Sequence, residues 1–170
     1  MYTQMHLEIL KIFWVLILFV LLSLILKLIF KKNVLQQFFP NAEHFFCLVH
    51  LFRNVYSKGY ELAMKIFKLS KGFPPEERFA LTSQIRRTSR SICLNLREAW
   101  SKRRYEAHFV SKLTDCDGEN SETNSSLDFA RDSGYITVAQ HEVLASLCRE
   151  IGKMLGSMMK RPEPFLISDR

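Results

Sequence analysis

The sequence predicts an all-α fold: an antiparallel up-down four-helix bundle, preceded by an extra hydrophobic N-terminal helix. Gly (6) and Pro (5) are scarce among the 170 residues, whereas a β-sandwich or barrel of this length needs more turn residues. Apolar residues recur at helical spacing in four successive stretches. The chain is also long enough, and at 48% hydrophobic apolar enough, to bury its own core.

The charge balance favours an anionic partner. Lys and Arg number 24 against 17 Asp and Glu, which gives a formal net charge of +7. An excess of this kind points to nucleic acid or to a membrane surface. With 24% charged residues beside the large apolar fraction, the composition excludes a disordered chain.

An uncharged stretch near the N-terminus predicts a transmembrane helix. Residues 12–26 contain no charged side chain, and with Lys11 and Lys27 at the flanks the apolar stretch covers residues 9–30. A bilayer-spanning helix needs ~20 residues, and lysine stems can reach back to the interface. No small-residue cleavage site of a signal peptide follows. One interpretation is membrane contact through residues 9–30; the other is a translation start assigned too far upstream, which makes residues 1–32 foreign to the domain.

The rest of the chain divides into a linker at residues 33–44, a bundle at residues 45–160 and a tail at residues 161–170. Lys31 and Lys32 follow the apolar stretch directly. Because positive charge beside a membrane span stays on the cytoplasmic side, the bundle is expected in the cytoplasm, either free or anchored at the inner face of the membrane.

The first two helices follow from their apolar stripes and from the residues between them. One narrow face of the first helix carries Leu51, Val55, Leu62, Ile66 and Leu69. Gly72 suits the end of this helix, and Pro74 and Pro75 forbid its continuation. The second helix is expected from Glu76 to Trp100, since Pro75 and the acids after it suit an opening turn. One of its faces carries Leu81, Ile85, Ile92, Leu96 and Ala99.

The third helix is expected from Tyr105 to Arg131, and the fourth begins after Thr137. The third prediction is the weakest, because this stretch contains several poor helix formers: Gly118, Asn120, Asn124, Ser125 and Ser126. Gly134 ends the third helix, and Thr137 with Gln140 matches a capping box. One face of the fourth helix carries Leu144, Leu147, Ile151, Met154, Leu155 and Met158.

Cysteine and histidine spacing predicts no metal, no cofactor and no disulfide framework. The four cysteines are far apart and form no CxxC pair: Cys47, Cys93, Cys116 and Cys148. No two of the five histidines stand at HxxxH or HExxH spacing. The cysteines are therefore expected to be buried, reduced thiols that pack as small hydrophobes.

No catalytic motif is present. The acids of the third helix lack the ExxH partner of a di-iron bundle: Asp115, Asp117, Glu119 and Glu122. The chain contains no Gly-x-Ser-x-Gly elbow, no P-loop and no dinucleotide fingerprint. We therefore expect a protein that is not an enzyme and has no catalytic residues.

Basic residues concentrate on the second helix, where Glu98 is the one acid between Arg78 and Arg104. If the helix continues through Arg104, one row beside the apolar face contains Arg86, Arg90, Arg97 and Arg104. Three further basic residues lie close by: Arg87, Lys102 and Arg103. Guanidinium forks at helical spacing suit phosphates, so these seven residues form the candidate nucleic-acid site. The alternative is that they pair with acids of the third helix: Glu106, Asp115, Asp117, Glu119 and Glu122.

Several motifs stand in order along the chain. They are Tyr60-Glu61-Leu62-Ala63, the run from Phe73 to Arg87 (FPPEERFALTSQIRR), Ser91-Ile92, Asn95-x-x-Glu98-Ala99 and Gly134-Tyr135-Ile136-Thr137. Together they resemble the small four-helix-bundle family encoded in intervening sequences of bacterial large-subunit (23S) rRNA genes. The resemblance covers about residues 51–159. Relatives of this family include accessory proteins of diversity-generating retroelements.

The resemblance implies a soluble homopentameric ring of up-down bundles, with a basic surface thought to bind nucleic acid and no enzymatic activity. Residues 1–46 lie outside it. Leu94 replaces a smaller residue of the family and points away from the apolar stripe of its own helix. We therefore expect Leu94 to serve a subunit contact.

Three classes of function remain open. The main expectation is a non-enzymatic protein that binds RNA or DNA without sequence preference, through its basic helix face and as a homo-oligomeric ring. The second class is a structural scaffold that assembles but binds no nucleic acid. The third is an adaptor anchored to the membrane through residues 9–30.

Overall fold

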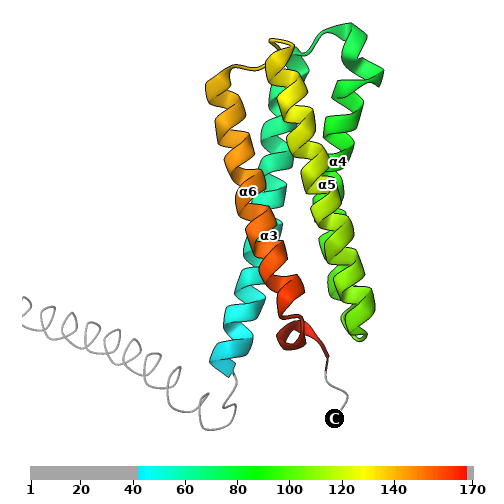
Figure 1. Cartoon of the computed structure of the whole chain (residues 1–170), viewed down its shortest axis with the longest axis vertical. Helices are drawn as coiled ribbons and strands as arrows, with labels where there is room; N and C mark the ends of the chain where they lie inside the picture. The colour runs from blue at the N-terminus through cyan, green and yellow to red at the C-terminus, as the bar shows by residue number, and fades with distance from the viewer. Residues whose placement is uncertain (1–41, 168–170) are drawn as a thin grey trace, which may run out of the picture. The chain divides into compact units, whose positions relative to one another are not determined.

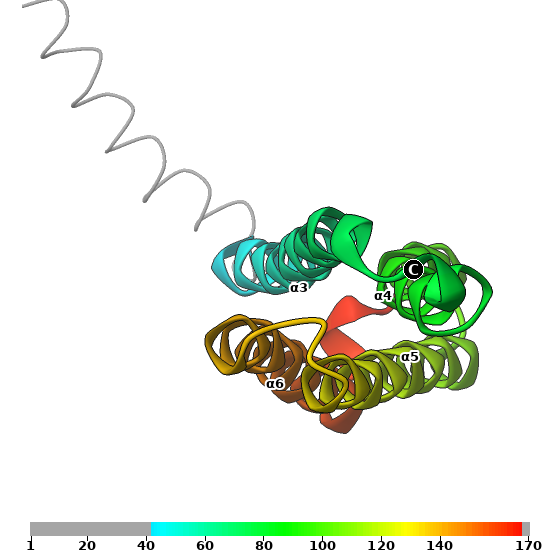
Figure 2. The ribbon, with the colours of Figure 1, turned by 90° about the horizontal axis from the view of Figure 1, so that it is seen from above.

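The computed structural model describes the backbone of residues 42–167 and the side chains of residues 50–167. Every regular element in this part of the chain is helical, and four long helices run alternately up and down: α3 (Ala42–Leu69), α4 (Leu81–Lys102), α5 (Glu106–Asp132) and α6 (Val138–Lys160) (Figure 1). Seen from above, the helices follow one another around the bundle in the order α3, α4, α5, α6 (Figure 2). The predicted up-down four-helix bundle is thus confirmed. The predicted extra N-terminal helix, with residues 9–30, lies outside the described residues.

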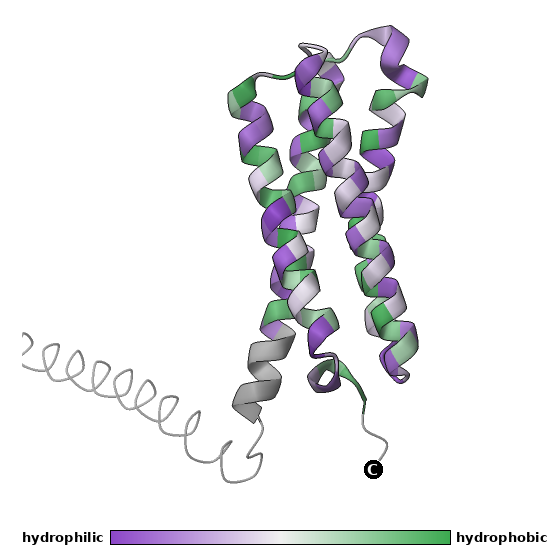
Figure 3. Ribbon diagram, viewed as in Figure 1, coloured by the Kyte–Doolittle hydropathy of each residue, from purple (hydrophilic) through white to green (hydrophobic). Residues whose placement is uncertain are grey.

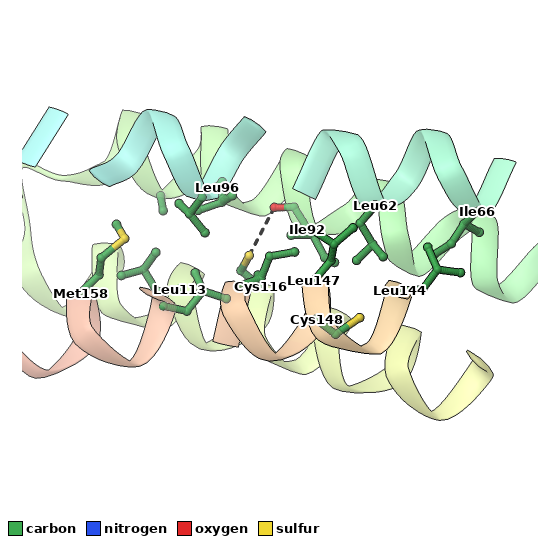
Figure 4. Close-up of a cluster of buried hydrophobic side chains, with 14 of the residues drawn as sticks. Leu62, Ile66, Ile92, Leu96, Leu113, Cys116, Leu144, Leu147, Cys148 and Met158 are labelled. Atoms are coloured by element: carbon green, nitrogen blue, oxygen red, sulfur yellow. Dashed lines mark hydrogen bonds between the residues drawn. The ribbon is translucent and has the colours of Figure 1, made fainter. Parts of the chain in front are cut away.

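The core of the bundle is built from the apolar stripes of all four helices. Apolar residues recur along each helix (Figure 3), and the close-up shows side chains from all four meeting in the interior (Figure 4). Leu62, Ile92 and Ile151 have no solvent exposure. Each such side chain contributes ~1.5–3 kcal/mol relative to leaving it in water. The Sγ of Cys116 donates a hydrogen bond to the Ile92 carbonyl at 3.3 Å, which joins α5 to α4 inside this core (Figure 4).

The second helix begins later than predicted. Pro75–Phe79 form a separate 3₁₀ turn, η3, and α4 starts only at Leu81. The carboxylate of Glu77 accepts a hydrogen bond from the Leu81 N–H at 3.0 Å. It also accepts one from the Tyr135 hydroxyl at 3.2 Å. Glu77 therefore does lie at the positive end of a helix, as the acids were expected to do, but it caps α4 from outside instead of forming its first turn.

The other helix ends show one difference and two confirmations. After α3, the chain continues through a short 3₁₀ turn, η2 (Ser70–Gly72), and Gly72 does not adopt the left-handed conformation of a glycine cap. Gly134 does adopt it, with φ of 74°, and ends the α5 segment as predicted. The predicted capping box is present: Thr137 Oγ1 accepts from the Gln140 N–H at 3.2 Å, and Gln140 Oε1 accepts from the Thr137 N–H at 2.8 Å.

Polar residues inside α5 explain why this helix forms despite its weak propensity. Asn120 is buried and donates from Nδ2 to the Cys148 carbonyl of α6 at 3.0 Å. Thr123 is fully buried and donates to Thr88 Oγ1 of α4 at 3.0 Å. Because these bonds join α5 to both of its neighbours, tertiary contacts compensate for the poor intrinsic helix formers.

The C-terminal segment returns to the bundle. A 3₁₀ turn, η4 (Glu163–Phe165), buries Phe165, whose ring centroid lies 5.8 Å from that of Phe109 in α5. The N–H of Ile167 donates to the Arg103 carbonyl at 3.2 Å. Among the helices that the structure describes, none is both long and apolar enough to cross a membrane.

Candidate nucleic-acid interface

Three arginines of α4 face aromatic rings of α3 and form what we call the arginine row: Arg86, Arg90 and Arg97. The guanidinium carbons of Arg86 and Arg90 lie 5.2 and 5.7 Å from the centroid of the Phe67 ring. That of Arg97 lies 4.7 Å from the Tyr56 ring. Spacings of four and seven residues place the three side chains on one face of the helix, as the sequence predicts. The structure also shows that each of these guanidinium groups lies over an aromatic ring of α3, which the sequence did not predict.

The arginine row is held in place without being neutralised. Arg86 Nε donates to the buried Ser70 Oγ at 2.7 Å, and Lys71 Nζ adds a further positive charge 4.9 Å from the Phe67 centroid. Within residues 50–167, no carboxylate forms an ion pair with Arg86, Arg90 or Arg97. A guanidinium that lies over a ring keeps most of its five in-plane N–H donors available. These donors can therefore bind an external anion.

Arg87, by contrast, is paired as the alternative interpretation expected. Its guanidinium nitrogens lie 3.9 Å from Glu119 Oε1 and 3.7 Å from Glu122 Oε2, both on α5. Glu122 also accepts a hydrogen bond from Gln84 Nε2 at 2.9 Å. Arg87 points away from α3 because it follows Arg86 by about 100° around the helix. It therefore contributes to the α4–α5 contact.

Lys102 is paired within its own helix. Its Nζ lies 2.6 Å from Glu98 Oε1, and Lys112 of α5 binds the other oxygen of Glu98 at 3.0 Å. Hydrogen bonds from Lys102 and Lys112 lower the pKa of Glu98 below its ordinary value. The Glu98 carboxylate therefore partly neutralises the charge of Lys102.

Arg103 and Arg104 lie beyond the end of α4, so the condition for a row that extends to Arg104, a helix that continues through that residue, is not met. The helix ends at Lys102, and Arg103 is its C-cap residue. Arg103 Nη1 donates to the Trp100 carbonyl at 2.5 Å, and its guanidinium carbon lies 4.1 Å from the Trp100 ring. Arg104 is exposed and follows the helix end. The row thus contains three arginines instead of four.

A shallow groove of about 530 Å³ lies on the outer side of α4 and η3. Its lining includes Arg86, Arg87 and Arg90, and also Arg78 and Phe79, which the sequence analysis did not assign to the site. Phe79 is 87% exposed. The signal that could have found it is its place beside an arginine at the end of the Phe-Pro-Pro-Glu-Glu-Arg-Phe run.

Leu94 lies at the other end of this groove and is 68% exposed. The prediction that its side chain points away from the core is confirmed. The Trp100 ring packs against Phe52 with centroids 4.5 Å apart. Tyr105 is exposed, with its ring edge toward His108.

The described cysteine thiols are not activated as nucleophiles. Cys93, Cys116 and Cys148 are buried and free, as predicted, while Cys47 lies outside the described side chains. Burial raises the pKa of Cys93 to about 11 and that of Cys148 to about 12, so both are protonated at neutral pH. Among residues 50–167, no group of three or more His, Cys, Asp or Glu side chains is placed to hold a metal ion.

The fold and the arginine row together define a small, basic four-helix-bundle protein. Residues 53–157 match the 23S rRNA-intervening sequence protein family, and the chain belongs to that family. The chain is also similar to a crystal structure of a protein of unknown function from the S23 ribosomal protein family of Bacteroides thetaiotaomicron. The two share 33% identity over 65% of this chain and 98% of the other, with a TM-score of 0.59. A comparison with curated proteins finds no match.

Proposed function

We propose that this chain is a non-enzymatic protein that binds RNA or DNA without sequence preference through the arginine row. The observation that carries the proposal is that three guanidinium groups at helical spacing lie over aromatic rings. In the described part of the chain they have no carboxylate partner. Four other basic residues of the predicted site occupy different settings: Arg87 and Lys102 are paired, and Arg103 and Arg104 follow the helix end.

Phosphate is the anion that this arrangement suits. A guanidinium presents a planar fork of donors that matches two phosphate oxygens. Arg86 and Arg90 are ~6 Å apart along the helix axis, and Arg97 is ~10 Å further, so one extended backbone can reach all three. Contacts of this kind neutralise the backbone and carry little sequence information. The expected ligand is therefore any nucleic acid that can lie along α4.

The active form in this proposal is a homo-oligomeric ring, with the pentamer suggested by the resemblance described above. Exposed apolar side chains on three helices support an assembly that covers them: Leu94 on α4, Phe129 on α5 and Val143 on α6. Because the arginine row is repeated in each subunit, the affinity of the oligomer exceeds that of a single subunit by ~10²-fold or more. A scaffold, the alternative function, would form the same oligomer without binding nucleic acid.

The test compares two variants of equal charge. The first changes the arginine row to glutamine (R86Q, R90Q and R97Q), because glutamine is a good helix former. The matched control removes three paired charges instead (R87Q, K102Q and R149Q); Arg149 is bound to Glu142 on the opposite side of the bundle. Binding of the full chain to single-stranded RNA and to duplex DNA is measured by fluorescence anisotropy at constant salt. Weaker binding of the first variant alone supports the proposal, and equal weakening of both assigns the binding to net charge and contradicts it.

A further inference from the structure

Phe79 is an exposed aromatic ring at the edge of the groove on α4. Phe79 is 87% exposed, the largest exposed fraction among the large hydrophobic residues between positions 50 and 167. The guanidinium carbon of Arg78 lies 5.2 Å from the centroid of its ring. A ring of this kind in water is unfavourable unless a partner covers it, and a neighbouring positive charge favours a partner that carries negative charge as well as an apolar face.

The turn that carries Phe79 is fixed to the bundle. One oxygen of Glu77 binds the Leu81 N–H and the other binds the Tyr135 hydroxyl, at 3.0 and 3.2 Å. The Phe73 ring packs on Tyr135 with centroids 5.5 Å apart. The backbone that carries Phe79 is therefore already ordered, which lowers the entropic cost of binding.

From Phe79 the groove continues along α4 past Arg86 and Arg90 and reaches Leu94. The groove thus has an apolar side chain near each end, Phe79 and Leu94, and arginines between them. An unpaired nucleotide offers the complementary pair of groups, a flat base and a phosphate, and bases stack readily on aromatic side chains. A duplex offers phosphates, but its base faces are covered by the neighbouring base pairs, so the Phe79 ring would have no partner.

We propose that the groove binds a single-stranded segment of nucleic acid, with an unpaired base stacked on Phe79 and the adjoining phosphates bound by Arg78, Arg86 and Arg90. This inference rests on the proposed function and narrows it to unpaired strands. Stacking is tolerant of sequence because every base has an aromatic face. The assignment therefore agrees with binding that has no sequence preference.

The experiment uses the full chain and three probes: a thymidine oligonucleotide, an oligonucleotide of the same length with abasic sites in place of the bases, and a duplex. The abasic strand keeps the phosphates and removes the stacking partner. We expect the wild type to bind the thymidine strand about tenfold more tightly than the abasic strand. The F79L variant keeps an apolar side chain but loses the aromatic face, so it should bind both strands as the wild type binds the abasic one. The F79W variant should restore the preference.

Three results would overturn the inference, and they separate it from the proposed function. If F79L keeps the full preference for bases while the glutamine variant of the arginine row loses affinity, the stacking site is wrong and the proposed function stands. If the wild type binds none of the probes, both are wrong. If F79L changes the sedimentation coefficient without changing its affinity for the thymidine strand, Phe79 is a subunit contact and the inference fails.

Discussion

At the scale of single residues, the buried thiols make the stability of the protein depend on pH. Burial raises the pKa of Cys93 to about 11 and that of Cys148 to about 12; for Cys93 the nearby Arg97 charge partly opposes this. In the unfolded chain a thiol has a pKa of about 8.5. A raised pKa means that the folded state holds its proton longer, so the stabilisation is complete below pH ~8.5 and is lost as the pH rises toward the folded-state values.

We therefore expect the free energy of unfolding to fall between pH ~8.5 and ~11, with part of this fall due to these two thiols. The measurement is urea unfolding at several pH values for the wild type and for the double variant C93A and C148A. The variant should be less stable at neutral pH, because it loses buried volume, but its stability should fall less steeply with pH. Parallel curves for the two proteins would show that the thiols do not contribute.

The residues of the candidate site were predictable from the sequence only in part. Helical spacing places Arg86, Arg90 and Arg97 on one face of one helix, and that placement is a local property of the chain. It does not say which residue of another helix meets each side chain. The Phe67 and Tyr56 rings, and the carboxylates that bind Arg87, are reached only through tertiary packing. The sequence therefore predicted that the arginines share one face and left open whether each is available to a phosphate or paired with a carboxylate. The structure shows which arginines are paired.

At the scale of elements, the junction between η3 and α4 depends on one carboxylate. Glu77 satisfies the N–H of Leu81 at the helix end and also binds the Tyr135 hydroxyl. The sequence could not distinguish this turn from the start of the helix, because a proline followed by acids suits both. The contact with Tyr135, which is distant in sequence, could not be inferred from this local pattern.

Changing Glu77 to alanine should therefore lower the free energy of unfolding by ~1–2 kcal/mol, since a cap and a second hydrogen bond are lost. Glu76 is the matched control, because it carries the same charge, precedes Glu77 directly and is exposed. E76A should change stability by less than ~0.5 kcal/mol. Chemical denaturation of the two variants tests this, and equal effects would mean that Glu77 acts only through its charge at the helix end.

The space around two helical glycines, Gly59 and Gly118, differs because α3 and α4 lie close together at Gly59. A Cβ atom at Gly59 of α3 would lie 3.1 Å from Ile92 Cγ2 and 3.3 Å from Cys93 Sγ on α4, whereas a Cβ at Gly118 of α5 would meet nothing within 4 Å. Alanine is favoured over glycine inside a helix by ~1 kcal/mol. At Gly59 the overpacking opposes this gain.

We expect G118A to raise the free energy of unfolding by ~0.5–1 kcal/mol, and G59A to lower it by ~1 kcal/mol or more. Thermal or chemical denaturation measures both. If G59A is stabilised as much as G118A, α3 and α4 are free to move apart, and the close contact that places the Phe67 ring under the arginine row is not rigid.

At the scale of the whole described bundle, the sequence was most informative where one period repeats over many residues. Apolar stripes on the first, second and fourth helices predicted those helices and a shared core, because each stripe is a local pattern that needs a partner to be buried. The return of the chain after α6 was not predictable in this way. Phe165 and Ile167 follow a proline in a short segment with no period, and only their contacts with Phe109 and Arg103 fix their place.

Binding of phosphates by the arginine row can be measured through its dependence on salt. The full chain and its glutamine variant at Arg86, Arg90 and Arg97 are titrated with single-stranded RNA at increasing salt, and circular dichroism verifies that both are folded. Each phosphate contact contributes ~0.7–0.9 to the slope of log affinity against log salt concentration. We expect the slope of the variant to be smaller by about 2 to 3 and its affinity at low salt to be weaker. Equal slopes for two folded proteins would contradict this expectation.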